Sequence, residues 1–175
     1  MMELKDFSFI YKYFSGEKQE SLLFLILGIA AILVSVIFFF FIKTTPAFFK
    51  GAAIPLLAIG IIQVVVGYTV HARSDKQQSM VAYNAGTDPQ FVKKAEMPRM
   101  ETVMKKFIIY RYAEIVLTLV GLGLFFYFRN NEAQQFLKGL GLTLAIQALL
   151  MLGADYFAEQ RGKVYSEGLT NFIQP

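Results

Sequence analysis

Two long apolar stretches near the start of the chain are separated by a short polar segment. Residues 21–42 hold 22 positions without a charged residue, and residues 47–70 form a second stretch in which Lys50 is the only charged residue. A helix that crosses a bilayer needs about 20 predominantly apolar residues. The two stretches therefore predict two transmembrane helices, with Thr45 as the N-cap and Pro46 as the first residue of the second.

A third apolar stretch follows Glu114. Fourteen uncharged residues run from there to Phe128, and at about 1.5 Å per residue they cover roughly 21 Å of a hydrocarbon core about 30 Å thick. The helix crosses the core only if it begins earlier, so we expect a span over residues 107–128. Arg111 and Glu114 must then lie at the membrane boundary or face protein.

A fourth stretch, residues 139–154, holds 16 uncharged residues. It becomes long enough to cross the bilayer as a span over residues 136–157, which places Lys138 at one boundary and Asp155 at the other. Asn131 precedes this span in a pattern typical of a helix N-cap. The second half of the chain is therefore expected to hold two further transmembrane helices.

The polar segments between the spans complete the predicted domain organisation. After residue 70 the chain shows no helix breaker until Asn84, so the second helix is expected to extend beyond the membrane. Asp88 is suited to cap a short helix that begins at Pro89, and Pro98 is suited to open the third long helix. The expected units are a first hairpin over residues 21–84, a connector over 85–97, a second hairpin over 98–165 and a tail over 166–175.

The N-terminal segment, residues 1–20, is predicted to form an amphipathic helix that Gly16 would end. Its apolar side chains recur every three or four residues. The length suits a helix that lies in the membrane interface or packs on the protein itself. The apolar stripe comprises Leu4, Phe7, Tyr11 and Phe14, with Ile10 alongside.

These elements predict an all-α integral membrane protein. Four transmembrane helices would form two antiparallel hairpins within a four-helix bundle, and helices two and three would extend into the cytoplasm. Of the 17 Lys and Arg residues, 12 lie in the N-terminal, middle and C-terminal segments, whereas four lie in the two short loops. Because cytoplasmic segments carry the excess of basic residues, we expect both termini in the cytoplasm and the protein in the plasma (inner) membrane.

The two predicted hairpins resemble each other in sequence. Residues 39–43 align with 125–129 at an offset of 86, and residues 49–51 align with 137–139 two positions later in register. Each half would hold two spans, so both would share one orientation and be related by an axis along the membrane normal. The alternative is a shared composition without a repeat, since any two hairpins ending in aromatic and basic residues give some matches.

Ionisable residues gather near the cytoplasmic ends of the predicted spans. Arg111 and Glu114 are three residues apart on one helix face, so they can pair. One interpretation is a network of boundary ion pairs. The other is a polar vestibule, open to the cytoplasm, that binds an ion or an anionic headgroup. The candidate residues are His71, Arg111, Glu114, Asp155 and Glu159.

Two amides lie deeper, because Gln63 and Gln147 fall about midway through the second and fourth spans. An amide in hydrocarbon must find a hydrogen-bond partner. The two residues are therefore expected either to bond between helices or to line a narrow polar path.

The composition excludes several kinds of chemistry. The chain has one histidine and no cysteine. The absence of cysteine excludes disulfides, thiolate catalysis and cysteine-ligated zinc or iron–sulfur centres. No sequence pattern of a zinc protease, a P-loop protein or a serine hydrolase is present. We therefore expect no catalytic residue, no cofactor, no metal and no nucleic-acid partner, with the lipid bilayer as the one certain environment.

Three classes of function remain. The favoured one is a non-enzymatic accessory, regulatory or immunity-type membrane subunit that binds another membrane component, either a different membrane protein or a second copy of the chain. The second is a small transporter or homo-oligomeric ion-conducting pore lined by Gln63, Gln147 or Glu114. The third is an inner-leaflet lipid-modifying enzyme with Glu114, His71 or Asp155 as acid or base.

Overall fold

Helices make up all the regular structure in residues 7–173, the part of the chain that the computed structural model describes. Four of them are long and apolar enough to cross a membrane, as predicted, so the chain is built as an integral membrane protein. In chain order the helices are α1 (Ser8–Phe40), α2 (Pro46–Thr87), α3 (Pro89–Phe91), α4 (Met97–Phe128) and α5 (Gln135–Ile173), with a π-helical turn at Val92–Glu96 and a 3-10 turn at Glu132–Gln134.

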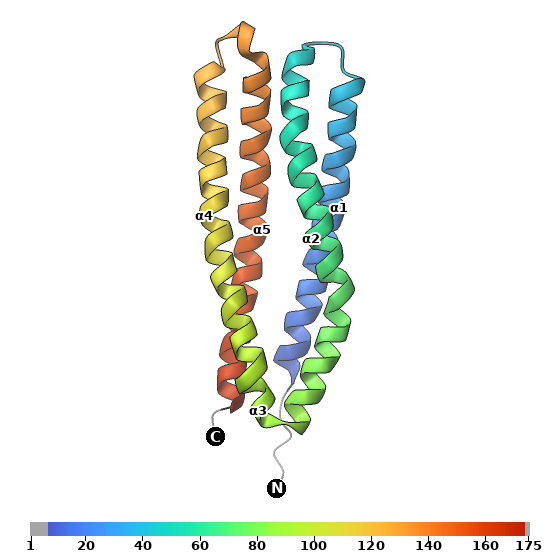
Figure 1. Ribbon diagram of the computed structural model, residues 1–175, viewed down its shortest axis with the longest axis vertical. Helices are drawn as coiled ribbons and strands as arrows, with labels where there is room; N and C mark the ends of the chain where they lie inside the picture. The colour runs from blue at the N-terminus through green and yellow to red at the C-terminus, as the bar shows by residue number, and fades with distance from the viewer. Residues whose placement is uncertain (1–6, 174–175) are drawn as a thin grey trace.

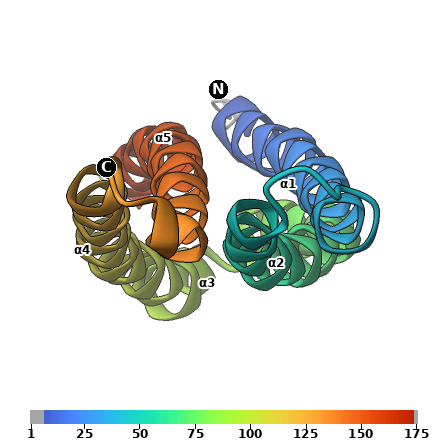
Figure 2. The same cartoon turned by 90° about the horizontal axis from the view of Figure 1, so that it is seen from above.

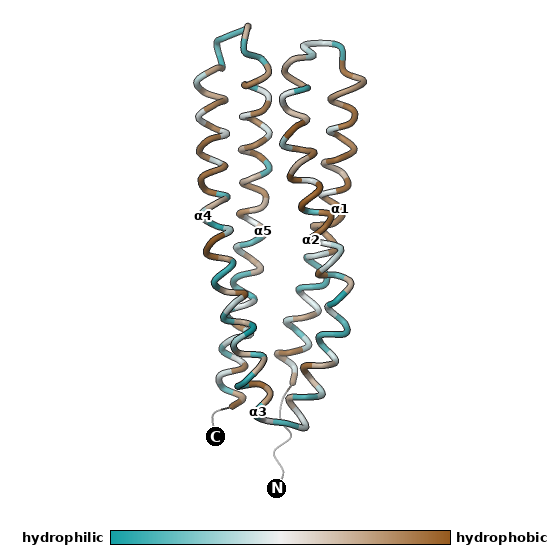
Figure 3. The backbone as a smooth tube through the Cα atoms, in the orientation of Figure 1, coloured by the Kyte–Doolittle hydropathy of each residue, from teal (hydrophilic) through white to brown (hydrophobic). Residues whose placement is uncertain are grey.

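The long helices lie side by side in two pairs (Figure 1). α1 packs along α2, α4 packs along α5, and α2 and α5 join the two pairs. Seen from above, α1 and α4 lie on opposite sides of this central contact (Figure 2). α1 begins and α5 ends at the end of the molecule where α3 lies. Polar residues are concentrated at that end, whereas apolar residues dominate the other half, which is the part suited to a membrane (Figure 3).

The contact between α2 and α5 brings two helix backbones together. A Cβ atom added to Gly51 would overlap the backbone carbonyl of Phe136, and one added to Gly139 would overlap the carbonyl of Phe48. Small residues allow such close approach in membrane proteins, where packing rather than the hydrophobic effect holds helices together. These two glycines therefore set the distance between the two helix pairs.

A hydrophobic core lies at the polar end, outside the predicted spans, and we call it the extramembrane core. Tyr13 of α1 stacks on Tyr165 of α5, with ring centroids 4.1 Å apart. All four long helices and the π-helical turn contribute side chains, so this end is packed like a small soluble bundle. The buried members are Ile10, Tyr13, Phe14, Val81, Ala85, Val92, Met100, Tyr165 and Leu169.

A buried carboxylate fastens the connector between the halves to this core. Glu96 is only 2% exposed and forms a bidentate ion pair with Arg99, with hydrogen bonds of 2.6 and 2.9 Å. The Tyr165 hydroxyl donates to the same carboxylate at 2.8 Å. Burial raises the pKa of Tyr165, and it raises the pKa of Tyr13 to about 12. Donors from α4 and α5 thus compensate the charge of Glu96.

The predicted helix end at Gly16 is wrong, because α1 continues without a break through this residue. The glycine is needed for packing instead: a Cβ atom there would lie 2.8 Å from Cδ of Arg161. The predicted stripe is also shifted, since Tyr11 is 51% exposed while its neighbours Ile10 and Phe14 are buried. Leu4, also assigned to that stripe, lies outside the described residues.

Every residue of 85–97 except Asp88 is helical, because α2 continues to Thr87, beyond the break expected at Asn84. Asp88 caps α3 by accepting a hydrogen bond from the Gln90 amide at 3.0 Å, and Asn131 caps the 3-10 turn in the same way through Ala133. Thr45 precedes α2 as expected, but it has a left-handed backbone, with φ of 46°, and its side chain makes no capping bond.

Candidate binding site between α4 and α5

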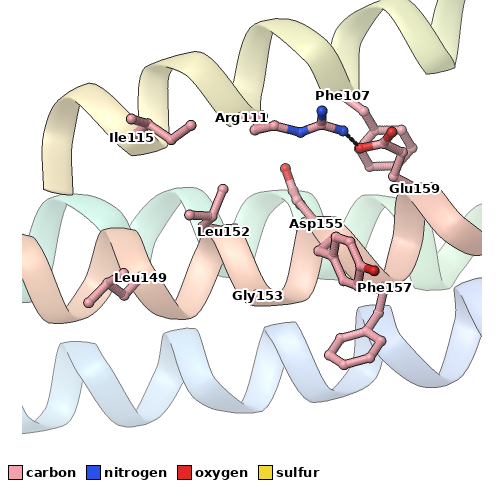
Figure 4. A pocket seen from close by; sticks show the side chains of 10 residues that line it. Phe107, Arg111, Ile115, Leu149, Leu152, Gly153, Asp155, Phe157 and Glu159 are labelled. Atoms are coloured by element: carbon pink, nitrogen blue, oxygen red, sulfur yellow. Dashed lines mark ion pairs between the residues drawn. The ribbon is translucent and has the colours of Figure 1, made fainter.

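A groove between α4 and α5 collects three of the predicted boundary residues (Figure 4). Arg111, Asp155 and Glu159 lie together there, while most of the remaining lining is apolar. The groove has a volume of about 460 Å³. Its lining residues are Phe107, Arg111, Ile115, Leu149, Leu152, Gly153, Asp155, Tyr156, Phe157 and Glu159.

The ion pairs of the groove differ from the predicted one. Arg111 pairs with Glu159 on α5 and not with Glu114 on its own helix. Lys163 also pairs with Glu159, at 2.9 Å. Glu159 has a side chain only 6% exposed, so two cations compensate one nearly buried carboxylate. With Asp155 included, two cations and two carboxylates lie together beside the apolar wall of the groove.

Glu114 is buried away from the groove. The residue is 3% exposed, and neither carboxylate oxygen has a hydrogen-bond donor among the described residues. It lies beside Asp155 of the neighbouring helix. Asp155 lines the groove and Glu114 does not, so a ligand in the groove would contact the carboxyl group of Asp155 but not that of Glu114.

His71 is separated from the other candidates. Its Nδ1 atom lies 3.3 Å from the backbone carbonyl oxygen of Lys18 on α1, and the residue does not line the groove. The acidic residues of the groove, Asp155 and Glu159, both lie on α5 instead. The structure therefore does not assemble His71, Glu114 and Asp155 into one acid–base site.

The two deep amides face each other across the α2–α5 contact. Gln63 Nε2 donates to Gln147 Oε1 at 3.5 Å, and the residues are 2% and 5% exposed. Neither residue lines the groove. In this arrangement the amides link two helices, and they do not face an open polar path.

A second cavity, which we call the junction pocket, was not anticipated from the sequence. It is lined by residues of all four long helices and has a volume of about 310 Å³. The only sequence signal for this pocket is that charged residues follow or precede each predicted span. The sequence does not show which span ends lie next to one another, because that depends on helix packing. Its ionisable lining residues other than tyrosines are Glu17, Glu20, Arg73, Lys106, Asp155 and Arg161.

Within residues 7–173 no group of three or more His, Asp or Glu side chains is arranged to hold a metal ion. Comparison with known protein families, characterised proteins and solved structures finds no match to this chain.

Proposed function

We propose that this protein is a non-enzymatic membrane subunit, of an accessory, regulatory or immunity type, that binds another membrane protein through the groove between α4 and α5. The observation that carries the proposal is Gly153. This exposed glycine lines the groove, and a Cβ atom added to it would meet nothing within 4 Å. The glycine is therefore not required by the packing of this chain.

A glycine that faces open space on a transmembrane helix lets a second helix approach closely. The wall beside Gly153 is apolar, as the side of a partner helix would be, and includes Leu149, which is 51% exposed. At one end the groove offers Arg111 and Asp155. Polar groups at the membrane boundary favour a partner that brings its own polar side chain, which a hydrocarbon tail cannot supply.

The same proposal includes the orientation in the membrane. The distribution of Lys and Arg favours a plasma (inner) membrane location with the extramembrane core in the cytoplasm. The polar end where α1 begins and α5 ends agrees with this threading. α2 and α4 would then extend into the cytoplasm, and α1 and α2 would form one antiparallel hairpin, with α4 and α5 as the other.

We further propose that the two hairpins are an internal repeat. The contacts at the centre of the molecule are reciprocal: Gly51 approaches Phe136, and Gly139 approaches Phe48. Gly139 follows Gly51 by 88 residues, and Phe136 follows Phe48 by the same 88 residues. A twofold axis between α2 and α5 would relate each residue to its equivalent 88 positions later, and it would therefore turn one of these two contacts into the other.

The test compares two leucine substitutions on exposed glycines. Gly153→Leu would fill the groove, whereas Gly123→Leu is a matched control, because Gly123 is also exposed, has nothing within 4 Å of an added Cβ atom and lies outside the groove. The full chain would be extracted from its native membrane in mild detergent, and copurifying membrane proteins would be identified. We expect Gly153→Leu to lose the partner and Gly123→Leu to retain it.

Three outcomes would contradict this proposal. Equal recovery of the partner with both variants would show that the groove is not the interface. Recovery of lipid alone, or of a second copy of the chain alone, would replace the partner with a different occupant. Ion flux through reconstituted liposomes would favour the transporter or pore instead, for which the mutual bond of Gln63 and Gln147 offers no open path.

A further inference from the structure

We infer that the junction pocket binds the phosphate-bearing headgroup of a membrane phospholipid. This goes beyond the proposed function, because the pocket is formed by all four long helices and its binding does not depend on a partner protein in the groove.

The pocket lies at the level where the predicted spans end. Each long helix contributes both a residue inside its predicted span and a residue just outside it. On α1 these are Phe24 and Glu20, and on α2 they are Val66 and Arg73. This is the depth at which lipid headgroups meet the hydrocarbon core.

The polarity of the lining follows the axis of the molecule. The residues within the predicted spans are mainly apolar, among them Phe24, Val66 and Ala154, whereas the charged lining residues other than Asp155 lie just outside the spans. The pocket has a volume of about 310 Å³. A space of that size suits a headgroup with its glycerol, with an apolar floor for the start of the acyl chains.

Most of the charges in the pocket compensate one another. Glu17 pairs with Arg73 at 3.3 Å, and Glu20 pairs with Arg161. Lys106 makes no ion pair within residues 7–173 and is exposed, although it lines the pocket. Asp155, the third carboxylate of the lining, makes no ion pair within residues 7–173 either, and it lies deeper, inside its predicted span. Lys106 is therefore the lining cation without an ion-pair partner among the described residues, and a charge-assisted bond from it to a phosphate is among the stronger polar interactions.

The neighbouring lysine supplies a matched control. Lys105 is exposed, does not line the pocket and pairs with Glu101 at 2.7 Å on the surface of α4. Lys106→Gln and Lys105→Gln remove the same charge from adjacent positions, so they change the general attraction to anionic lipid equally. A difference between them reports the pocket itself.

The experiment uses the purified full chain in neutral detergent and measures bound ligand by native mass spectrometry. The probe is dioctanoyl phosphatidylglycerol. Dioctanoylglycerol, which lacks the phosphate, and glycerol phosphate, which lacks the chains, test the two parts of the ligand separately. We expect one tightly bound phospholipid, about tenfold weaker binding for Lys106→Gln and a change below about twofold for Lys105→Gln.

The inference is overturned if Lys106→Gln binds the phospholipid as well as the unsubstituted protein does, or if both lysine variants lose affinity equally. It is also overturned if dioctanoylglycerol binds as tightly, because the phosphate would then not be recognised. Equal binding of glycerol phosphate would assign the pocket to a soluble anion and not to a lipid. None of these outcomes bears on Gly153, so the proposed function is tested independently.

Discussion

Replacing Gly51 by alanine should separate the two helix pairs. A Cβ atom at this position would lie 2.8 Å from the carbonyl carbon of Phe136 and would overlap its oxygen. The obstacle is backbone and not a flexible side chain, so no rotamer change relieves it. α2 and α5 must therefore move apart along the contact that joins the halves of the molecule.

The magnitude follows from two opposing terms. Alanine is better than glycine in a helix interior by up to about 1 kcal/mol, whereas overpacking costs about 1–3 kcal/mol. Because the overlap at Gly51 is with backbone, we take the upper end of that range and expect a net loss of about 2 kcal/mol. Gly123→Ala meets open space and should gain up to about 1 kcal/mol. The same substitution is thus expected to have opposite signs at the two positions.

Reversible unfolding in mixed micelles, followed by circular dichroism, would measure this difference. A gap of about 3 kcal/mol is roughly a hundredfold in the unfolding equilibrium. The chain has no cysteine, so spin labels on cysteines at Ile62 and Ile146, which are 51% and 48% exposed, would report the separation of α2 and α5 directly. A Gly51→Ala protein as stable as Gly123→Ala, with an unchanged label distance, would refute the backbone contact.

Three further predictions concern buried polar groups. Glu96→Ala should destabilise the protein by about 3–5 kcal/mol in thermal unfolding, because it leaves Arg99 without its buried partner; a change below about 1 kcal/mol would contradict the network. The pKa of Tyr13 is raised to about 12 by burial, against about 10 in an unfolded chain. Between these values only the unfolded chain loses the proton, so stability should fall as pH rises, by about 1.4 kcal/mol per pH unit. Tyr13→Phe should reduce that slope, and melting temperatures from pH 9 to 12 would show an unchanged slope if the tyrosine is not buried. A double-mutant cycle with Gln63→Leu and Gln147→Leu should give a coupling of about 0.6 kcal/mol, and no coupling would mean that the amides do not bond.

The number of spans and two of the caps could be predicted because their causes are local. Uninterrupted apolar length decides whether a helix can cross a bilayer. The side chains of Asp88 and Asn131 bond to backbone two residues away, so short sequence windows contain all the partners involved.

The partners of Gly16 and Arg111 could not be predicted from local sequence. The sequence pattern predicts a helix end at Gly16, about two turns into α1. In the structure this glycine makes room for Arg161, which is 145 residues later. Arg111 has an acidic residue three positions away on its own helix, yet it pairs with Glu159 of α5. Both choices depend on helix packing, and the junction pocket, which exists only where four helix ends meet, depends on it even more.

The extramembrane core joins the first helical turns to the last. Ile10 and Phe14 are covered by Tyr165 and Leu169, which a ribosome adds more than 150 residues later. During synthesis the core side chains of α1 therefore stay exposed until both helix pairs have entered the bilayer. Closure of this core is therefore a late step in biogenesis. A chain stalled before α5 is complete would expose a hydrophobic surface that quality-control proteases and chaperones are suited to detect.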